Sequence, residues 1–228
     1  MKSETRREFM VGSSMLIGGA VLGSELFFPK KVQAAKVEFP ESSCGLEKKS
    51  GKKVLVAYAS RCGTTGGVAE AIGKVLCDRG AVVDVRLVGN VNDLSPYHAI
   101  IVGSAIRMGK WLPEAAGFVK NNQDTLNRLP IAYFVVCMTM KDNTAENRSK
   151  VLAYLDPVRK EAPRIQPVAT GLFPGALNFN KLSFVHKTIL KAKGASEGDY
   201  RDWSAIRTWA EGLCSPLLAL GGKRYAER

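Results

Sequence analysis

The chain has 228 residues, of which 46% are hydrophobic, and its 33 Lys and Arg against 21 Asp and Glu give a formal net charge of +12. This apolar fraction excludes a chain that is disordered throughout, and five Cys exclude a small fold built on disulfides. No uncharged apolar stretch reaches the roughly 18 residues of a membrane span, which argues against a polytopic membrane protein. The net charge gives information about binding partners and not about the fold. Nucleic acid, an anionic membrane surface and an anionic ligand all remain possible partners.

The first 34 residues have the organisation of an export signal. A basic start with Arg6 and Arg7 precedes an uncharged stretch rich in Gly and Ser, 9–24, and Val32-Gln33-Ala34 then offers small residues at the two positions that a signal peptidase reads. The paired arginines resemble a twin-arginine export signal, so we expect cleavage near Ala34 and a location in the periplasm or on the outer face of the cytoplasmic membrane. An uncleaved anchor is the alternative, although this stretch is short for a span and Glu25 follows it.

Most of the positive charge belongs to the part behind the signal. Residues 1–34 hold five basic and three acidic side chains, so 28 basic and 18 acidic side chains remain, a net charge of +10. Residues 35–51 are polar and contain Pro40 and Gly45, and we expect them to be a flexible lead-in to a single domain at 52–228. Cys44, in this lead-in, could form an intermolecular bridge after export.

Behind residue 51, short apolar runs alternate with segments of helical spacing. The expected strands are 53–58, 82–87, 99–103, 131–138 and 168–173. The expected helices are 68–79, 113–120, 144–155, 182–191 and 203–213. Pro113 suits a first helical turn, Thr144 an N-cap and Gly80 a helix end. The alternation predicts an α/β domain, a doubly wound three-layer sandwich around a five-stranded parallel sheet, which binds ligands at the carboxyl ends of its strands.

The loop between the first strand and the first helix has the composition of a phosphate site. Residues 60–65 read Ser-Arg-Cys-Gly-Thr-Thr. Backbone N–H groups at a helix N-terminus attract an anion, and hydroxyl groups add donors. The spacing is neither that of the dinucleotide fingerprint nor that of the P-loop. An ordinary polar connection is the alternative.

The pattern from Val56 to Thr65, hydrophobic-x-Tyr-x-Ser-x-x-Gly-x-Thr, resembles the flavodoxin phosphate-loop signature. The resemblance implies a flavodoxin-like fold with FMN as cofactor. It also implies which residues wrap the FMN phosphate: Ser60, Arg61, Cys62, Gly63, Thr64 and Thr65.

A second stretch narrows the resemblance to one flavodoxin-like branch. Residues 103–111 read Gly-Ser-Ala-Ile-Arg-Met-Gly-Lys-Trp and precede a helix ending in Phe-Val-Lys at 118–120, which resembles menaquinone-dependent protoporphyrinogen IX dehydrogenase. Residues 170–172 are similar to the fifth strand of that family, and 199–203 to the start of its last helix. The resemblance spans 52–213. It implies an FMN-dependent dehydrogenase that passes electrons from a reduced, porphyrinogen-like organic substrate to a quinone.

The resemblance places two further loops beside the flavin ring. The loop after the third strand contributes Ser104, Ala105, Ile106, Arg107, Met108, Gly109, Lys110 and Trp111. The loop after the fourth contributes Cys137, Met138 and Thr139. We expect Trp111 to stack on the ring, with a place in the core as the alternative. Arg107 and Lys110 are candidates for anion contacts, and Met108 stands where the family has a bulky, often aromatic, residue.

The remaining candidates each have a structural interpretation. Cys62 could be reactive at a helix N-terminus, but a small donor to a phosphate is the favoured role. His98 and His186 have no partnered nucleophile, so we expect structural roles. The chain has no Cys-x-x-Cys, no metal site is expected, and no catalytic acid or base can be named, which leaves the chemistry to the cofactor.

Two interpretations remain open for the function and its partners. The basic, amphipathic segment 182–193 could lie at an anionic membrane that carries the quinone, or it could simply cover the sheet. The protein could be an exported flavodoxin-type electron carrier without substrate chemistry of its own, although such carriers are usually acidic and residues 35–228 are not. No nucleic-acid partner is expected, because no stripe of aromatic and basic residues accompanies the charge.

Overall fold

The computed structural model describes residues 37–47, 52–182, 187–189, 192 and 195–218. The expected export signal at 1–34 lies outside these ranges, and so does much of the helix expected at 182–191. In the ranges that the structure describes, no helix is both long enough and apolar enough to cross a membrane.

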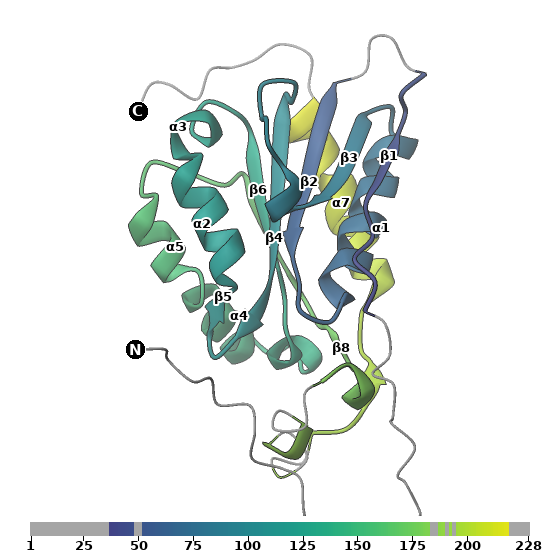
Figure 1. The fold of residues 1–228 in the computed structure, drawn as a ribbon, viewed down its shortest axis with the longest axis vertical. Helices are drawn as coiled ribbons and strands as arrows, with labels where there is room; N and C mark the ends of the chain where they lie inside the picture. Colours follow the sequence, from purple (N-terminus) through teal and green to yellow (C-terminus); the bar gives the residue numbers. More distant parts are fainter. Residues whose placement is uncertain (1–36, 48–51, 183–186, 190–191, 193–194, 219–228) are drawn as a thin grey trace, which may run out of the picture. The chain divides into compact units, whose positions relative to one another are not determined.

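A parallel sheet forms the centre of the domain (Figure 1). Its parallel strands are β2 (Lys53–Ala59), β3 (Val82–Leu87), β4 (Ala99–Arg107), β6 (Ile131–Val136) and β7 (Ala169–Phe173). They lie in the order β3-β2-β4-β6-β7, which confirms the expected five-stranded, doubly wound sheet with its switch point between β2 and β4. Two short antiparallel strands extend it, β1 (Ser42–Cys44) beside β3 and β5 (Lys110–Trp111) beside β4.

Helices cover both faces of the sheet, as Figure 1 shows. Their bounds are α1 (Thr64–Asp78), α2 (Pro113–Asn121), α3 (Gln123–Leu126), α4 (Ala145–Ala153), α5 (Asp156–Glu161) and α7 (Trp203–Leu218). The 3-10 turns are η1 (Val88–Asn90), η2 (Met138–Lys141) and η3 (Phe179–Lys181), and a small hairpin joins β8 (Ala176–Leu177) to β9 (Gly198–Asp199). Helices α1 and α7 pack on one face, and α2, α4 and α5 pack on the other.

The apolar strands are buried on both sides, as the sequence indicated. In β2, Leu55 and Ala57 point into the core under α2, whereas Val56 and Tyr58 point into the core under α1, and all four are 0% exposed. Successive side chains of a strand point to opposite faces, so a sheet covered twice needs an apolar residue at nearly every position. Each fully buried large side chain contributes about 1.5–3 kcal/mol of transfer free energy.

Several element boundaries differ from the expected ones. Helix α1 begins at Thr64, directly after Gly63, whereas the expected helix began at residue 68. The phosphate loop is therefore shorter than expected. The segment 144–155 holds α4 alone, with Thr144 as its N-cap accepting from the Asn147 N–H at 3.1 Å as expected, and α5 follows separately. Helix α7 continues five residues beyond the expected end, to Leu218.

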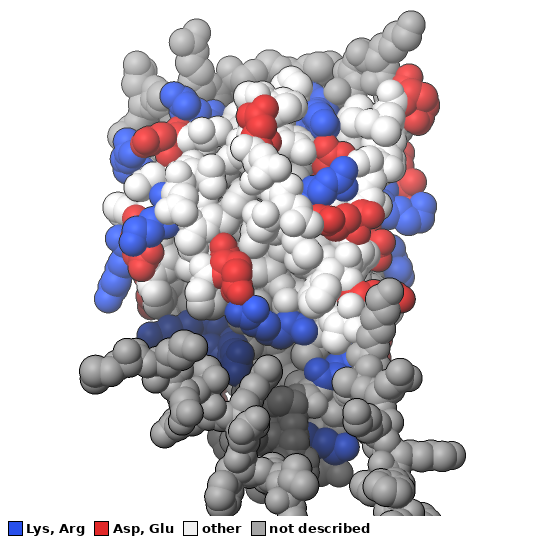
Figure 2. Space-filling view, in the orientation of Figure 1, with Lys and Arg blue, Asp and Glu red and all other residues white. Residues whose placement is uncertain are grey.

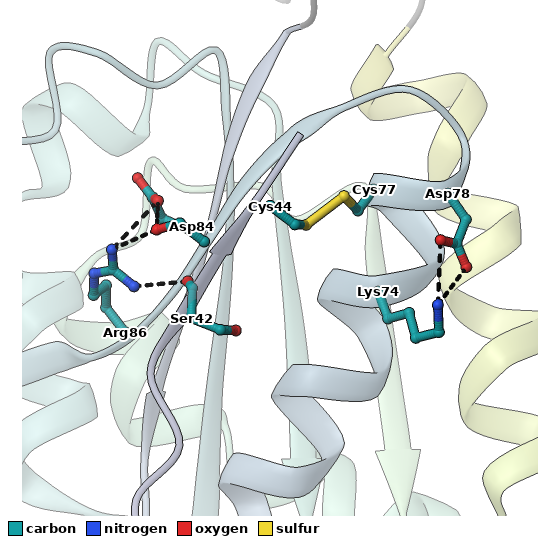
Figure 3. The surroundings of a disulfide bond; sticks show 8 residues. Ser42, Cys44, Lys74, Cys77, Asp78, Asp84 and Arg86 are labelled. Atoms are coloured by element: carbon teal, nitrogen blue, oxygen red, sulfur yellow. Dashed lines mark hydrogen bonds and ion pairs between the residues drawn. A yellow bond between two sulfur atoms is a disulfide. The ribbon is translucent and has the colours of Figure 1, made fainter. Parts of the chain in front are cut away.

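The expectation that 35–51 is only a flexible lead-in is wrong for 42–44, which form β1 on the outer edge of β3 (Figure 3). An unpaired edge strand exposes a row of backbone donors and acceptors, and β1 satisfies part of that row. The intermolecular bridge that Cys44 could have formed is also ruled out in this structure. Cys44 forms a disulfide with Cys77 of α1, with the two Cα atoms 6.2 Å apart, a usual separation for such a bond.

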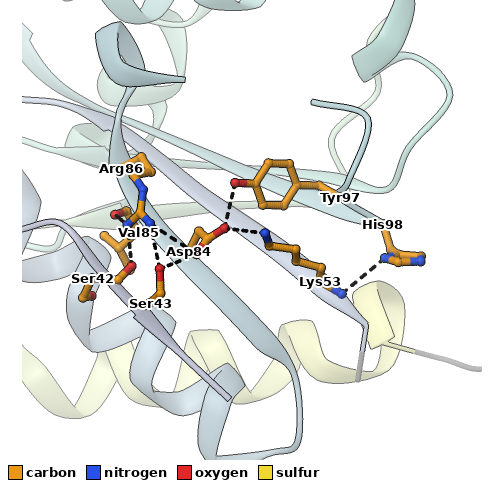
Figure 4. Close-up of polar contacts among 8 residues, drawn as sticks. All are labelled: Ser42, Ser43, Lys53, Asp84, Val85, Arg86, Tyr97 and His98. Atoms are coloured by element: carbon orange, nitrogen blue, oxygen red, sulfur yellow. Dashed lines mark hydrogen bonds and ion pairs between the residues drawn. The ribbon is translucent and has the colours of Figure 1, made fainter. Parts of the chain in front are cut away.

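A buried carboxylate on β3 joins β1 to the sheet (Figure 4). Asp84 is 5% exposed and accepts hydrogen bonds from the Ser43 hydroxyl, from the Lys53 ammonium at 2.9 Å and from the Tyr97 hydroxyl at 2.8 Å. Burial by itself would raise the pKa of Asp84, but these three donors outweigh it and hold the pKa below its ordinary value. His98 has the expected structural role, because its Nδ1 accepts from the backbone N–H of Lys53.

Candidate functional site

A cavity of about 820 Å³ lies where the parallel strands end. Loops that follow β2, β4, β6 and β7 surround it, at the edge where doubly wound sheets bind their ligands. Thirteen of the expected site residues line it: Ser60, Arg61, Cys62, Thr64, Thr65, Ala105, Ile106, Arg107, Met108, Gly109, Cys137, Met138 and Thr139. The structure therefore brings together three loops that lie far apart in the sequence.

One end of this cavity is built to receive an anion. Gly63 has a φ of 80°, a left-handed conformation that glycine adopts without strain, and it places the loop at the N-terminus of α1. Within α1, all of which is described, the first turn contains no acidic side chain to compete for the backbone N–H groups. The hydroxyl oxygen of Thr65 is buried and has no hydrogen-bond partner among the described residues. A buried hydroxyl without a partner is costly, and a phosphate oxygen would supply one.

Arg61 lies in the same loop, but its guanidinium is held by α2. One of its nitrogens forms an ion pair with the Glu114 carboxylate at 2.6 Å, and both side chains are about half exposed. This pair joins the phosphate loop to the helix that follows β5. Arg61 therefore lines the cavity while part of its charge is compensated by Glu114.

The hairpin of β4 and β5 forms a second wall. Its two tip residues, Met108 and Gly109, both have positive φ, 51° and 72°. Two-residue hairpins that follow the twist of a sheet often require this conformation at both central positions. The Met108 side chain is 93% exposed at the edge of the cavity, and Lys110 is exposed but does not line it.

Two expected residues of this stretch lie in the core instead of facing the cavity. Trp111 is 4% exposed and packs edge-on against Tyr133, with ring centroids 5.2 Å apart, so the core alternative describes it and ring stacking does not. The cause is β5, whose antiparallel pairing with β4 turns Trp111 toward α2. Ser104 is fully buried, and its hydroxyl accepts from the backbone N–H of Leu112 at 3.0 Å, which fixes the start of α2.

Burial disfavours the thiolate form of both cysteines that line the cavity. Burial raises the pKa of Cys62, although Lys181 and Arg107 oppose this, and the thiol lies 3.6 Å from the Lys181 carbonyl oxygen that accepts its hydrogen bond. Burial also raises the pKa of Cys137. A thiolate is the reactive form of cysteine, so Cys62 does not fit the role of a nucleophile. Its one proton is donated to the Lys181 carbonyl oxygen, and donation to a phosphate stays a prediction.

Sequence reasoning missed one wall of the cavity. The segment after β7 contributes Gly175, Ala176, Lys181, Leu182 and Ile189, and three residues from elsewhere complete the lining, Leu112, Val136 and Tyr154. The signal was available, because a doubly wound sheet places the loop after its last strand at the same edge as the others. The composition of this segment, without a motif, gave no separate indication.

A second cavity, of about 680 Å³, adjoins the first on the other side of the phosphate loop. Five residues line both cavities: Cys62, Thr64, Ala176, Lys181 and Leu182. Gly63, which does not line the first cavity, lines this one together with Glu38, Phe39 and Pro40 of the N-terminal segment. The phosphate loop and the segment after β7 thus border both cavities.

Basic side chains gather near this end of the domain. On the face shown in Figure 2, Lys and Arg form a band below most of the Asp and Glu, toward the end where Figure 1 places β8. The lining of the first cavity includes Arg61, Arg107 and Lys181. The site therefore favours anionic ligands.

A sheet in the order β3-β2-β4-β6-β7, with a hydroxyl-rich loop before α1 and walls after β4 and β6, defines a flavodoxin-like protein whose site implies a flavin. A family model described as a flavodoxin domain matches residues 55–204, more than half of the chain. The chain belongs to the flavodoxin domain family.

The chain is also similar to proteins with curated names. A protein of Leishmania major named protoporphyrinogen IX dehydrogenase (quinone) is 27% identical over 184 residues, which cover 74% of this chain and 77% of the relative. A protein of the same name from Escherichia coli strain K12 is 24% identical over 172 residues, 69% of this chain and 92% of the relative. A solved flavodoxin from the domain Archaea, 18% identical, covers 72% of this chain and 96% of its own with a TM-score of 0.45.

Proposed function

We propose that this protein is an FMN-dependent oxidoreductase, similar to protoporphyrinogen IX dehydrogenase, that passes electrons from a reduced organic substrate to a quinone. The observation that carries the proposal is the first cavity, which combines a phosphate loop at one end with an apolar wall and exposed cations at the other. The names of the two relatives support the substrate and the acceptor.

Different residues of the first cavity would bind different parts of FMN. The backbone N–H groups at the start of α1 and the hydroxyls of Ser60, Thr64 and Thr65 would bind the phosphate. The loops around Ile106 and Met138 would hold the ring between them. When bound, FMN supplies the two-electron chemistry, and the protein positions the ring and limits the access of water. No side chain is assigned as acid or base.

The cations at the cavity suit a substrate that carries carboxylates. Arg107 and Lys181 both act electrostatically on Cys62 in the loop, which places their charges close to the site. A porphyrinogen with carboxylate side chains would be oriented by such charges. We propose Arg107 and Lys181 as its anion contacts, with Lys110 beside them on the hairpin.

The second candidate function is an exported flavodoxin-type electron carrier. The fold alone suits both functions, because a carrier and a dehydrogenase of this family would hold the flavin alike. Electron carriers of this kind are usually acidic, which lets them dock on basic partners. The net charge of +10 on residues 35–228 favours the dehydrogenase.

We propose that the protein is exported by the twin-arginine route and works in the periplasm or on the outer face of the cytoplasmic membrane, in peripheral contact with anionic lipids. The sequence around Arg6 and Arg7 supports the route. The Cys44–Cys77 disulfide supports the destination, since disulfides persist in oxidising compartments and are rare in the bacterial cytoplasm.

The assay that tests the proposal supplies protoporphyrinogen IX and a menaquinone analogue to the flavin-loaded protein. We expect oxidation that depends on quinone and exceeds the autoxidation blank. A variant in which Arg107 is changed to Gln should raise KM for the porphyrinogen more than it lowers kcat, whereas Arg128→Gln, in the exposed turn after α3, should change neither. Electron exchange with redox proteins but no porphyrinogen oxidation would favour the carrier instead.

A further inference from the structure

Residues 37–44, which we call the strap, run past the phosphate loop and end in β1. The Tyr58 hydroxyl, at the end of β2, donates to the Pro40 carbonyl oxygen at 2.9 Å. A Cβ on Gly66 would lie 2.6 Å from the Pro40 ring, and one on Gly63 would collide with the Glu38 carbonyl oxygen. The loop and the first turn of α1 therefore have glycine where the strap crosses them.

The strap is anchored at its other end. The Glu41 carboxylate accepts from the Leu87 backbone N–H at 2.8 Å and from the Asn90 amide at 3.0 Å. Strand β1 pairs with β3 over only three residues. The covalent anchor is the disulfide from Cys44 to Cys77, which fastens the strap to α1, the helix whose first turn the strap crosses.

The strap also forms part of a cavity wall. Glu38, Phe39 and Pro40 line the second cavity opposite Cys62 and Thr64, which in turn line the first cavity. Any movement of the strap thus removes a support from the back of the phosphate loop. A loop that must be ordered when a ligand binds weakens that binding by the cost of ordering it.

We propose that the Cys44–Cys77 disulfide locks the strap against the phosphate loop and so holds the flavin in its site. This inference rests on the proposed function, because it takes FMN as the ligand. Reduction by a small dithiol delivers two electrons and two protons, breaks the S–S bond into two thiols and closes the dithiol into a cyclic disulfide. The strap then keeps only its noncovalent contacts, and FMN dissociates more readily.

This role of the disulfide implies that FMN binds before export and that the disulfide forms afterwards. In a reducing cytoplasm both thiols stay free, the strap is loose and FMN enters the site. After export, a thiol-oxidising catalyst takes two electrons and two protons from Cys44 and Cys77, and the closed strap retains the cofactor where no free FMN is supplied.

The experiment measures the Kd for FMN by the quenching of flavin fluorescence, on the stripped protein with the disulfide intact and after reduction. We expect the Kd to rise about tenfold or more on reduction, because binding must then order the loop. The Cys44→Ser/Cys77→Ser variant should bind like the reduced protein. Cys214→Ser, which removes a half-buried thiol on α7, should bind like the oxidised one.

A second variant distinguishes a loosened strap from a loss of folding. Tyr58→Phe removes the bond to Pro40 and leaves the disulfide in place, so it should weaken FMN binding in the oxidised protein while circular dichroism stays unchanged. An equal Kd for the oxidised and reduced proteins, with Tyr58→Phe also without effect, would overturn the lock. If the oxidised protein binds no FMN at all, the proposed function itself fails.

Discussion

Thr65 has a hydroxyl that is buried in the first turn of α1 without a partner among the described residues, and this predicts two effects of opposite sign. Thr65→Val keeps the shape and removes the hydroxyl. Without ligand, the variant should be as stable as the parent or more stable, because the buried oxygen no longer lacks a partner. Its affinity for FMN should fall about tenfold or more, because a hydrogen bond to a charged group contributes about 1.5–3 kcal/mol. Urea denaturation and flavin titration measure the two effects.

The control for Thr65 is Thr208→Val, which changes an exposed threonine of α7. We expect no change in FMN affinity for it. A stripped Thr65→Val protein that is strongly destabilised would show that the hydroxyl has a structural partner, and would contradict its role in binding the phosphate.

Replacing Met108 at the hairpin tip with Gly should raise stability and lower activity. Its left-handed φ costs roughly 1 kcal/mol for a residue with a Cβ and nothing for glycine, so Met108→Gly should raise the free energy of unfolding by about 0.5–1 kcal/mol. Its exposed side chain at the cavity edge is where substrate or quinone would make contact, so kcat/KM should fall.

Met108→Ala provides the matched comparison, because it removes the side chain but keeps the backbone strain. Its stability should stay near that of the parent, while its kcat/KM should fall as in Met108→Gly. If both variants retain full activity, the tip has no part in the reaction.

At the scale of elements, the joint between β1 and β3 depends on Asp84, which binds Ser43 of β1. Asp84→Asn leaves the Lys53 ammonium without its buried partner and should cost about 1–3 kcal/mol at pH 7. Because the folded pKa of Asp84 is lowered, its contribution is present above the unfolded pKa of about 4 and is lost as the pH falls through the folded value.

Urea denaturation across this acidic range measures the prediction for Asp84. The difference between parent and Asp84→Asn should shrink as the pH falls below about 4. Asp78→Asn, which breaks an exposed pair with Lys74, should stay within about 0.5 kcal/mol at every pH. A constant difference for Asp84→Asn at all pH values would contradict the assigned role of the charge.

The helices and strands also show which parts of the fold could be predicted from the sequence. The apolar runs predicted the five parallel strands, because burial on both faces leaves a local signal. The composition of the Ser60–Thr65 loop placed it before a helix, and the loop does lead into α1. Strand β1 could not be predicted, because it depends on β3 and Cys77, which lie far along the chain. The orientation of Trp111 depends on a two-residue strand, which is too short to produce a periodic pattern.

At the scale of the whole molecule, the net charge predicts how the proposed dehydrogenase would meet a quinone in a membrane. Residues 35–228 carry a net +10, and basic side chains gather toward the end of the domain that holds the site (Figure 2). Oxidation of substrate by quinone in anionic vesicles should therefore be faster than by quinone in neutral vesicles. The advantage should disappear as salt shortens the Debye length below about 8 Å. Equal rates on both kinds of vesicle would contradict peripheral binding to anionic lipid.

The central claim, that the first cavity is a flavin site, is tested most directly by the flavin content of the purified protein. Absorbance and chromatography of the released cofactor should find about one FMN per chain, and the stripped protein should recover it on titration. A colourless protein that takes up no FMN, with its disulfide intact or reduced, would contradict the assignment of this cavity.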